Sequence, residues 1–308
     1  MARILVTGAS GRLGSAIIKA LSPGNEIVAM VQQADKPIEG VKNFAADITS
    51  KQSIDSAFEG IDTVIHLAGI VSQYRFGKKA IMNVNVNGTK NVVDACKEHG
   101  VKRIVFASSV DVYGSKRKDV LNESSETKPS DYYGKSKLLA EQAIMGSDMQ
   151  YAILRMAAIY GPGFEGSFFK VFNAIAKRKA YIIGSGSNNL ALLHINDAIS
   201  AFSLSAITSS SGIYNISDGN SYTQLQLYSI AAKMLGVEYK FKHINQIIAM
   251  IIARLKGFDI DELRFITSNR VIDISKAKKE LGFTPKVSIM DGGSELVNLF
   301  KTSGRQNA

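Results

Sequence analysis

The amino-acid sequence predicts an α/β fold, in which a doubly wound parallel sheet is joined to a smaller C-terminal substrate lobe. Continuous apolar runs of strand length alternate with helix-like stretches through the first half of the chain, as in parallel sheets that are covered on both faces. A glycine-rich turn separates the first run from the first helix. After Gly163 the alternation gives way to polar turns, such as the one at 184–189, which indicates a second unit.

The elements follow one another with the spacing of strand–helix–strand units. Because each apolar run is short and bounded by turn residues, we interpret it as a buried strand. The expected strands are Arg3–Thr7, Glu26–Val31, Thr63–Leu67, Arg103–Ser108, Tyr151–Met156 and Gly212–Ser217. The expected helices are Ser15–Leu21, Asn87–His99 and Gly134–Met145. Right-handed crossovers between such strands give a doubly wound sheet, which binds ligands at the carboxyl ends of its strands.

The composition is that of an ordinary globular protein with an excess of positive charge. The net charge is +10 and the pI is about 9.5, which fits either a solvated basic surface or attraction of a phosphorylated ligand. No aromatic-rich RNA motif, zinc finger or helix-turn-helix pattern accompanies the charge, so we expect no nucleic-acid partner.

Cysteine content and hydropathy predict a cytoplasmic protein. Cys96 is the single cysteine, so no intrachain disulfide is possible, and we expect it to be buried as a small apolar residue. No run of about 18 apolar residues predicts a membrane span. No signal peptide pattern precedes the first strand.

The first strand runs into the segment Thr7–Gly14 (TGASGRLG), and a helix follows. Gly8 permits a tight turn, Gly11 lets the backbone approach a pyrophosphate, and Gly14 lets the helix pack close to the strand. The helix N-terminus then offers free N–H groups and the positive end of its dipole to the phosphates. In this strand–turn–helix context the glycine spacing predicts binding of a dinucleotide.

The loop and the later change of pattern together suggest a division into domains. We expect residues 1–162 and 190–217 to form a Rossmann-type dinucleotide-binding domain. Residues 163–189 and 218–308 would form a substrate-binding lobe over the carboxyl ends of the strands.

The residue that distinguishes NAD from NADP should follow the second strand, where an acid binds the ribose 2′-hydroxyl of NAD and an arginine accommodates the 2′-phosphate of NADP. Gln32 occupies this position and is neither an acid nor an arginine, so it does not distinguish NAD from NADP. Arg12 and Lys36 could supply positive charge, so the cofactor is NAD or NADP with a lean to NADP. Asp47 is expected to meet the adenine edge, or alternatively to be a loop or capping aspartate.

Tyr133 and Lys137 stand four positions apart in the segment YGKSK. On a helix this spacing places both side chains on one face. A free tyrosine titrates near pH 10, so a base at pH 7 needs a shift of roughly three units, or about 4 kcal/mol. One ammonium about 4 Å away, at an effective dielectric near 20, supplies about that much. The pair therefore predicts a tyrosine acid/base supported by a lysine.

Ser109 strengthens this interpretation, because it lies at the carboxyl end of an expected strand, where the substrate should bind. Its hydroxyl could donate to the reacting oxygen while Tyr133 moves the proton. Val110 and Asp111 follow it and are further candidates for contact with the substrate. The four histidines show no metal-ligand spacing, and we expect no metal.

These segments together resemble the extended short-chain dehydrogenase/reductases, the NAD-dependent epimerase/dehydratase family, over nearly the whole chain. The matching segments are TGASGRLG at 7–14, HLAG at 66–69, NVNGT at 85–89, SSVDVYG at 108–114, YGKSK at 133–137, LRMAAIYGPG at 154–163, LHIND at 193–197 and DISKAKKELGFTP at 273–285.

The resemblance implies roles for individual residues. Tyr133 would be the acid/base, Lys137 would hold the nicotinamide ribose and lower the tyrosine pKa, and Ser109 would bind the reacting oxygen. Asn85 would support the active-site helix. The positions expected to bind the cofactor are Gly8, Ser10, Gly11, Arg12, Leu13, Gly14, Gln32, Asp47, Ile48, Leu67, Ala68, Gly69, Asn85, Ala107, Tyr133 and Lys137. The resemblance also implies a homodimer built from the helices near 87–99 and 134–146.

The sequence departs from the family pattern in ways that affect the substrate. Met156 replaces the usual proline after the arginine of the LRP motif, and the stretch between Gly69 and Asn85 is short for a sugar epimerase. The apolar segment Ile244–Phe258 is either a helix packed in the lobe, or a helix that lines a site for an apolar substrate or lies on a membrane surface. Arg264 lies near the place where sugar epimerases bind phosphate, although a surface salt bridge is an equal alternative.

Four functions follow from these features. We favour a nucleotide-sugar epimerase, similar to UDP-glucose/galactose 4-epimerase, in which Tyr133 takes the proton from a sugar hydroxyl while hydride passes to the nicotinamide. The alternative is an NAD(P)-dependent dehydrogenase or reductase of a lipid-like alcohol, similar to 3-beta-hydroxysteroid dehydrogenase or dihydroflavonol reductase. A sugar dehydratase, with Asp111 at the position where that branch carries an acidic residue as its base, and a non-catalytic dinucleotide sensor are further alternatives.

Overall fold

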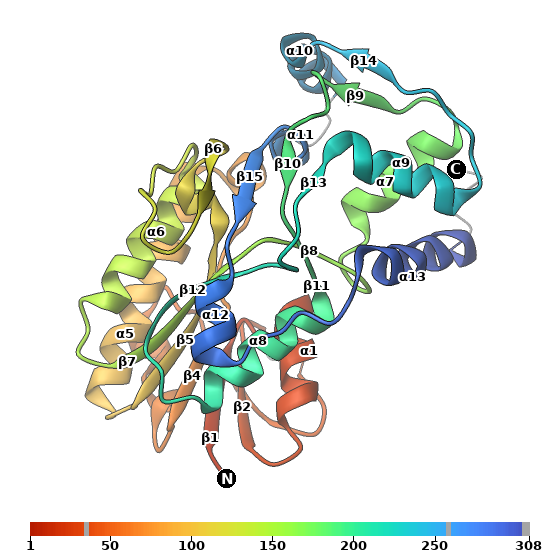
Figure 1. The fold of residues 1–308 in the computed structure, drawn as a ribbon. Coiled ribbons are helices and arrows are strands. Elements are labelled where there is room, and N and C mark those ends of the chain that lie inside the picture. Colours follow the sequence, from red (N-terminus) through yellow and green to blue (C-terminus); the bar gives the residue numbers. More distant parts are fainter. Residues whose placement is uncertain (34–36, 257–259, 304–308) are drawn as a thin grey trace.

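The computed structural model describes residues 1–33, 37–256 and 260–303 (Figure 1). Its centre, within these ranges, is a parallel sheet of seven strands in the order β12-β7-β5-β4-β1-β2-β3. The strands are β1 Arg3–Thr7, β2 Glu26–Val31, β3 Lys42–Ala45, β4 Thr63–His66, β5 Arg103–Ser109, β7 Gln150–Met156 and β12 Gly212–Ile216. The order reverses between β1 and β4, and this reversal is where doubly wound sheets bind ligands.

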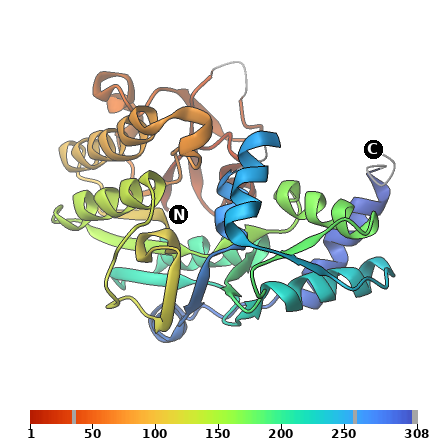
Figure 2. The same ribbon diagram turned by 90° about the horizontal axis from the view of Figure 1, so that it is seen from above.

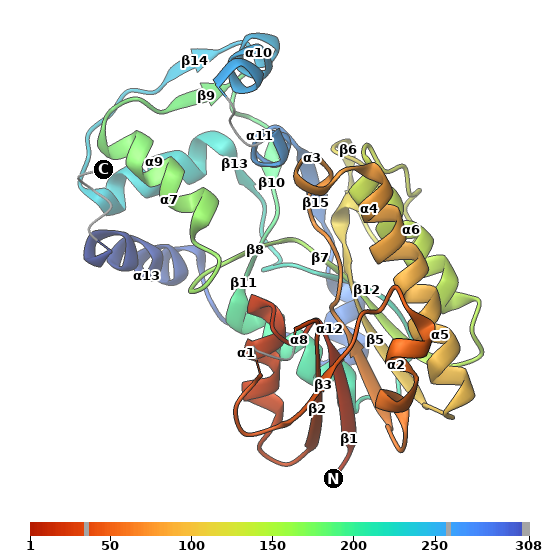
Figure 3. The ribbon, with the colours of Figure 1, turned by 180° about the vertical axis from the view of Figure 1, so that it is seen from behind.

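Helices cover both faces of the sheet (Figure 3). On one face lie α1 Arg12–Leu21, α8 Ile195–Ile207 and α12 Ser275–Leu281; on the other lie α2 Lys51–Ile54, α5 Gly88–Glu98 and α6 Tyr132–Met145. Each layer contributes its own buried apolar cluster, which includes Ile17 and Phe202 on the first face and Val92 and Ile144 on the second. The α/β doubly wound class is therefore confirmed, and the buried position of Cys96 is confirmed as well.

A smaller lobe lies beyond the carboxyl ends of the strands, beside the large domain when seen from above (Figure 2). Its elements are α7 Gly166–Ala176, β9 Tyr181–Ile183, α9 Gln224–Leu235, β14 Lys242–Ile244, α10 Gln246–Lys256, α11 Ile260–Ile266 and α13 Ile289–Thr302. Helices α7, α9 and α13 share a third apolar cluster, in which the rings of Phe172 and Phe300 are in edge contact. Two-stranded ladders link the parts: β8 Ala158–Tyr160 with β11 Leu192–His194, β10 Asn189–Leu190 with β13 Tyr222–Thr223, and β6 Lys116–Leu121 with β15 Asn269–Ile272.

The chain returns to the large domain after the lobe. Strand β15 pairs with β6, and the side chains of Ile272, Ala277 and Phe283 lie in the apolar cluster beside the central sheet. The predicted division assigned 218–308 to the lobe, but this stretch of it packs with the large domain (Figure 1). The reason is local: the apolar side of α12 fits against β12 and α8.

Short irregular helices connect several of the larger elements. They are the 3₁₀ helices η1 Asp55–Phe58 and η3 Val110–Tyr113, the π-helix η2 Asn83–Asn87, and the short α-helices α3 Gln73–Phe76 and α4 Lys78–Met82. Helix η3 follows β5 directly, and η2 runs into α5. Irregular helical turns of this kind often occur at functional sites.

Candidate active site

The glycine loop between β1 and α1 has the geometry of a phosphate cradle. Gly8 has a φ of +70°, and a Cβ there would lie 2.7 Å from the nitrogen of Ala68. A Cβ on Gly14 would lie 2.3 Å from the carbonyl oxygen of Gly8. Gly11 is exposed, and no side chain caps the N-terminus of α1. The loop therefore fits a pyrophosphate, with the backbone N–H groups of α1 left open to it.

A hydrogen-bonded chain fixes the loop that follows β4 against the glycine loop. Nδ1 of His66 lies 2.7 Å from Oγ1 of Thr7, and Nε2 of His66 lies 2.9 Å from Oγ1 of Thr89. Thr89 in turn donates to the carbonyl of Asn85 at 2.7 Å. Because Thr89 uses its proton there, it accepts from Nε2–H of His66. Burial lowers the pKa of His66 to about 3, so the imidazole is neutral and its Nδ1 accepts from the hydroxyl of Thr7.

Asn85 connects this network to the helix that carries the tyrosine. Its amide donates to Oγ of Ser136 at 2.9 Å and to the carbonyl of Ile70 at 2.9 Å, and its oxygen accepts from the nitrogen of Ile70 at 2.7 Å. The π-helix η2 supplies the extra residue that turns this buried amide toward α6. The expected contact between Asn85 and the active-site helix is present.

The structure brings Tyr133, Lys137 and Ser109 together. Asp131 caps α6 by accepting from the nitrogen of Gly134 at 2.8 Å, so the helix begins just before Tyr133. The buried ammonium of Lys137 donates to the carbonyl of Ala107 at 2.7 Å and lies 5.9 Å from the ring centre of Tyr133. Ser109 ends β5 and lies next to the Tyr133 phenol. A serine hydroxyl, a tyrosine phenol and a lysine ammonium thus converge at the carboxyl end of the sheet.

The charges around Tyr133 differ from the expectation. Burial raises the pKa of Tyr133 above its ordinary value, and the carboxylate of Asp111 raises it further. Burial also lowers the pKa of Lys137 to about 8. The ammonium of Lys137 is directed to the carbonyl of Ala107, and for Tyr133 the cost of burial is the largest influence on the pKa.

The other predicted cofactor residues lie around the same edge. Ser10, Arg12 and Gln32 are exposed, and the guanidinium of Arg12 lies 6.0 Å from the ring centre of Phe164. Leu13, Leu67 and Ala68 are half-buried, Gly69 is exposed, and Ala107 is buried. Lys36 lies outside the described residues.

Asp47, Ile48 and Val110 have clear structural contacts. Asp47 is exposed and accepts from the backbone and hydroxyl of Thr49 at 2.9 Å, as a loop aspartate does. Ile48 is buried beside Gly88. Val110 packs in the apolar core of the large domain, which leaves its main chain for any contact with a substrate.

Three charged residues near the site were not predicted. Glu141 and Arg155 form a buried ion pair at 2.6 Å one turn beyond Lys137. Arg270 forms an ion pair with Asp111 at 2.6 Å. An arginine inside an otherwise apolar strand, as in β7, is the signal that could have revealed the first pair, because a buried charge requires a partner.

A cavity of about 1100 Å³ occupies the lobe. Its lining is mostly apolar and includes Phe168, Phe172 and Phe265, with Ala253 of α10 on one side. Cations also line it; they are Lys170, Lys177, Arg178, Lys179 and Lys242. Of the apolar segment Ile244–Phe258, residues 257 and 258 lie outside the described residues, and Ile247, Ile251 and Leu255 are exposed on α10.

The described ranges contain neither a membrane-spanning helix nor a metal-binding cluster. No helix in them has the length and apolar character needed to cross a membrane. In the same residues, no three His, Cys, Asp or Glu side chains gather where they could hold a metal ion.

Fold and site together define a dinucleotide-dependent enzyme with a tyrosine–lysine–serine centre. The model of the NAD dependent epimerase/dehydratase family matches residues 4–217. The chain belongs to this family and is an NAD-dependent enzyme of the extended short-chain dehydrogenase/reductase type. The resemblance seen in the sequence motifs is confirmed.

Similar proteins differ in their substrates. The chain is 26% identical over 275 residues to N-acetyl-alpha-D-glucosaminyl-diphospho-ditrans,octacis-undecaprenol 4-epimerase of Escherichia coli O157:H7, covering 87% of this chain and 81% of the relative. It is 26% identical to 3-beta-hydroxysteroid dehydrogenase of Mycolicibacterium neoaurum, covering 100% and 95%. The structure of MoeE5 in complex with UDP-glucose and NAD is 25% identical, with a TM-score of 0.78 and coverage of 98% and 99%.

Proposed function

We propose that this enzyme is a 4-epimerase of a diphosphate-linked sugar, most simply a nucleotide sugar, with Tyr133 as the acid/base. The observation that carries the proposal is the convergence of Ser109, at the end of β5, with Tyr133 and the buried Lys137, both near the start of α6. This arrangement can remove a proton from a hydroxyl and return it. The E. coli relative and MoeE5, whose names include a sugar epimerase and a UDP-glucose complex, support the sugar substrate.

Each residue has a distinct role in this chemistry. Ser109 donates to the reacting oxygen, and Tyr133 holds the proton that leaves the hydroxyl and later returns it. Lys137, fixed to the carbonyl of Ala107, places a positive charge next to the cofactor ribose and the tyrosine. The bound oxidised nicotinamide supplies a hydride acceptor and a further positive charge, which opposes the raised pKa of Tyr133.

The residues around the glycine loop fit a nicotinamide dinucleotide. Gly11 leaves room on the exposed side of the loop, and Gln32 offers neither the carboxylate typical of NAD sites nor the arginine typical of NADP sites. The bound NAD of MoeE5 supports NAD, whereas the exposed Arg12 supports the lean to NADP. We expect modest discrimination between the two.

The second candidate is an NAD(P)-dependent dehydrogenase or reductase of a lipid-like alcohol. The cavity of about 1100 Å³ favours it, because apolar lining of this extent suits an apolar ligand. The steroid dehydrogenase of M. neoaurum, which matches the whole chain, supports it as well. Within the sugar proposal the same cavity would hold the carrier of the diphosphate, with its lysines near the phosphates.

We further propose a homodimer formed through α5 and α6. The two helices pack side by side. Leu138 and Leu139 of α6 are only half-buried, and Met145 is exposed. The molar mass in solution, measured by light scattering, tests this proposal.

One assay separates the two candidate functions. Purified enzyme is incubated with NAD⁺ or NADP⁺ and with UDP-glucose, UDP-N-acetylglucosamine, a polyprenyl-diphosphate sugar or a 3β-hydroxysteroid. An epimerase returns its hydride, so we expect an epimeric sugar without net formation of reduced cofactor. Stoichiometric reduced cofactor with a steroid, and no reaction of any sugar, would replace our first choice by the second. Tyr133→Phe should abolish either turnover and keep the dinucleotide bound.

A further inference from the structure

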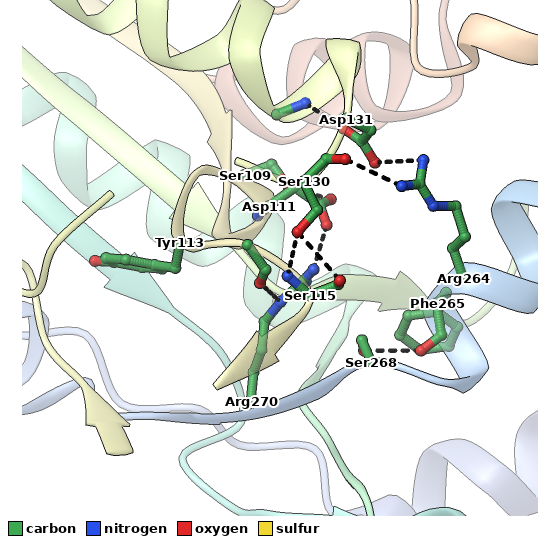
Figure 4. A network of polar contacts seen from close by, with 12 residues as sticks. Ser109, Asp111, Tyr113, Ser115, Ser130, Asp131, Arg264, Phe265, Ser268 and Arg270 are labelled. Atoms are coloured by element: carbon green, nitrogen blue, oxygen red, sulfur yellow. Dashed lines mark hydrogen bonds and ion pairs between the residues drawn. The ribbon is translucent and has the colours of Figure 1, made fainter. Parts of the chain in front are cut away.

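Arg270 reaches from the lobe side of the chain to the catalytic segment of the large domain (Figure 4). Its Nη2 lies 2.6 Å from Oδ1 of Asp111, and its Nε donates to the carbonyl of Gly114 at 2.6 Å. The register of β15 against β6 shifts between Asn269 and Val271, at the position of Arg270. Such an irregularity can re-aim a side chain, and here the arginine is buried against η3.

Asp111, the partner of Arg270, is also hydrogen-bonded to Ser109. Its second oxygen, Oδ2, accepts from Oγ of Ser109 at 2.9 Å, and Oγ accepts from the nitrogen of Asp111 at 3.2 Å. Asp111 thus holds the hydroxyl of Ser109 through two hydrogen bonds, and it is also one of the charged groups next to Tyr133. A hydrogen-bonded chain therefore runs from Arg270 through Asp111 to Ser109, beside Tyr133.

A second arginine, Arg264, pairs with Asp131, the other carboxylate near Tyr133. Nη1 of Arg264 lies 3.4 Å from Oδ2 of Asp131, and Nη2 donates to the carbonyl of Ser130 at 3.1 Å (Figure 4). The charged groups that face Tyr133 are Asp111 from η3, Asp131 from the cap of α6, and Lys137 from α6 itself. Both carboxylates are thus paired with arginines from the segment 264–270.

We infer that Arg270 is a positioning residue for catalysis: by pairing with Asp111 it fixes the hydroxyl of Ser109 and offsets the negative charge next to Tyr133. The inference rests on the proposed function in so far as Tyr133 is taken to be the acid/base. An unpaired Asp111 would oppose the tyrosinate, since like charges disfavour ionisation. The large domain thus carries the acid/base, and the returning chain carries the cation that makes its ionisation easier.

The test follows the ionisation of Tyr133 directly and needs no substrate. All eleven tyrosines are replaced by difluorotyrosine, whose more acidic phenol titrates within the stable pH range, and are observed by ¹⁹F NMR with saturating NAD⁺. The signal missing from Tyr133→Phe identifies Tyr133. We expect Arg270→Gln to raise the midpoint by about one pH unit and Asp111→Asn to lower it. Arg270→Lys should retain part of the effect, because it keeps the charge but loses the fork geometry.

A double-mutant cycle separates a direct charge effect from general loosening of the structure. Arg270→Gln in the Asp111→Asn background should leave the midpoint nearly unchanged. Arg3→Gln, which removes a cation paired with Glu26 at the other end of the sheet, should have no effect. An unchanged midpoint in Arg270→Gln, or an equal shift with and without Asp111, would overturn the inference.

Folding is checked by circular dichroism for each variant. If Arg270→Gln does not fold, Asp111→Asn and Arg270→Lys still decide the matter, because a midpoint unmoved in both would contradict the inference. Failure of the proposed function is a separate result: it would appear as turnover retained by Tyr133→Phe, whatever the titration shows.

Discussion

Glu141 of α6 and Arg155 of β7 form a buried ion pair, with side-chain exposures of 0% and 3%. Arg155 donates from Nε and Nη2 to both carboxylate oxygens, at 3.0 and 2.6 Å, and Ser108 donates to the same carboxylate. The pair joins α6 to β7 and lies one helical turn beyond Lys137. The carboxylate also favours the charged form of that lysine.

Removing one member of this pair should be costly. Glu141→Gln leaves the Arg155 guanidinium buried without a counter-charge, so we expect the free energy of unfolding to fall by about 3–5 kcal/mol. Urea unfolding followed by circular dichroism measures it. Glu98→Gln, at an exposed pair with Lys51, is the control and should cost less than about 1 kcal/mol. A loss for Glu141→Gln as small as the control's would contradict this interpretation of the pair.

His66 should make the protein less stable in acid. Its pKa is about 3 in the fold because of burial and the nearby Lys137, whereas an unfolded histidine titrates near 6.5. Below pH 6.5 the unfolded state therefore binds a proton that the folded state does not, and stability falls by about 1.4 kcal/mol per pH unit. Unfolding of wild type and His66→Gln at pH 7, 6 and 5 should show a shallower decline in the variant. The exposed His243→Gln should keep the wild-type slope.

The glycine loop offers a test of cofactor binding that leaves the fold intact. A Cβ at Gly11 meets only the carbonyl oxygen of Gly8, at 3.1 Å, and its φ of −72° suits any residue. Gly11→Val should therefore fold but lose NAD⁺ binding, as measured by calorimetry. Gly146→Val, which meets Gln142 at 3.3 Å at the far end of α6, should bind normally. Normal affinity in Gly11→Val would disprove the phosphate cradle.

The enzyme should discriminate only weakly between NAD⁺ and NADP⁺. Gln32 is exposed and uncharged, and Arg12 is the nearby cation of the glycine loop, so we expect dissociation constants for NAD⁺ and NADP⁺ within about tenfold, tilted to NADP⁺. Titration of the purified protein with both cofactors measures the ratio, and Arg12→Gln should remove the tilt. A hundredfold preference for NAD⁺, about 2.7 kcal/mol, would show that the lean to NADP is mistaken.

The sequence predicted the elements whose signal is local. The strand β5 and the helix α6 were expected within one or two residues, because apolar runs and the Tyr133–Lys137 spacing depend only on neighbours along the chain. The strand β3 was missed, since Lys42–Ala45 is half-exposed and lacks an apolar run. The charged strand β6 was also missed, because its partner is more than a hundred residues away.

The same distinction separates the predicted site residues from those that were missed. Ser109 directly follows an apolar run, and Tyr133 and Lys137 stand four positions apart, so each has a local signal in the sequence. Arg270 acquires its role from a shift in strand register, and Glu141 from an arginine on another strand. Neither interaction follows a fixed spacing in the sequence, so it can be seen only in the structure.

The return of β15 to the large domain has a consequence for engineering this enzyme. A chimera that takes everything after residue 217 from a relative would replace part of the cavity lining together with the neighbour of Asp111. Specificity and reactivity would then change at once. A crossover placed after 266 and before 269, with the native β15 retained, would allow the part of the lining from Leu227 to Ile266 to be exchanged while Asp111 keeps its own arginine.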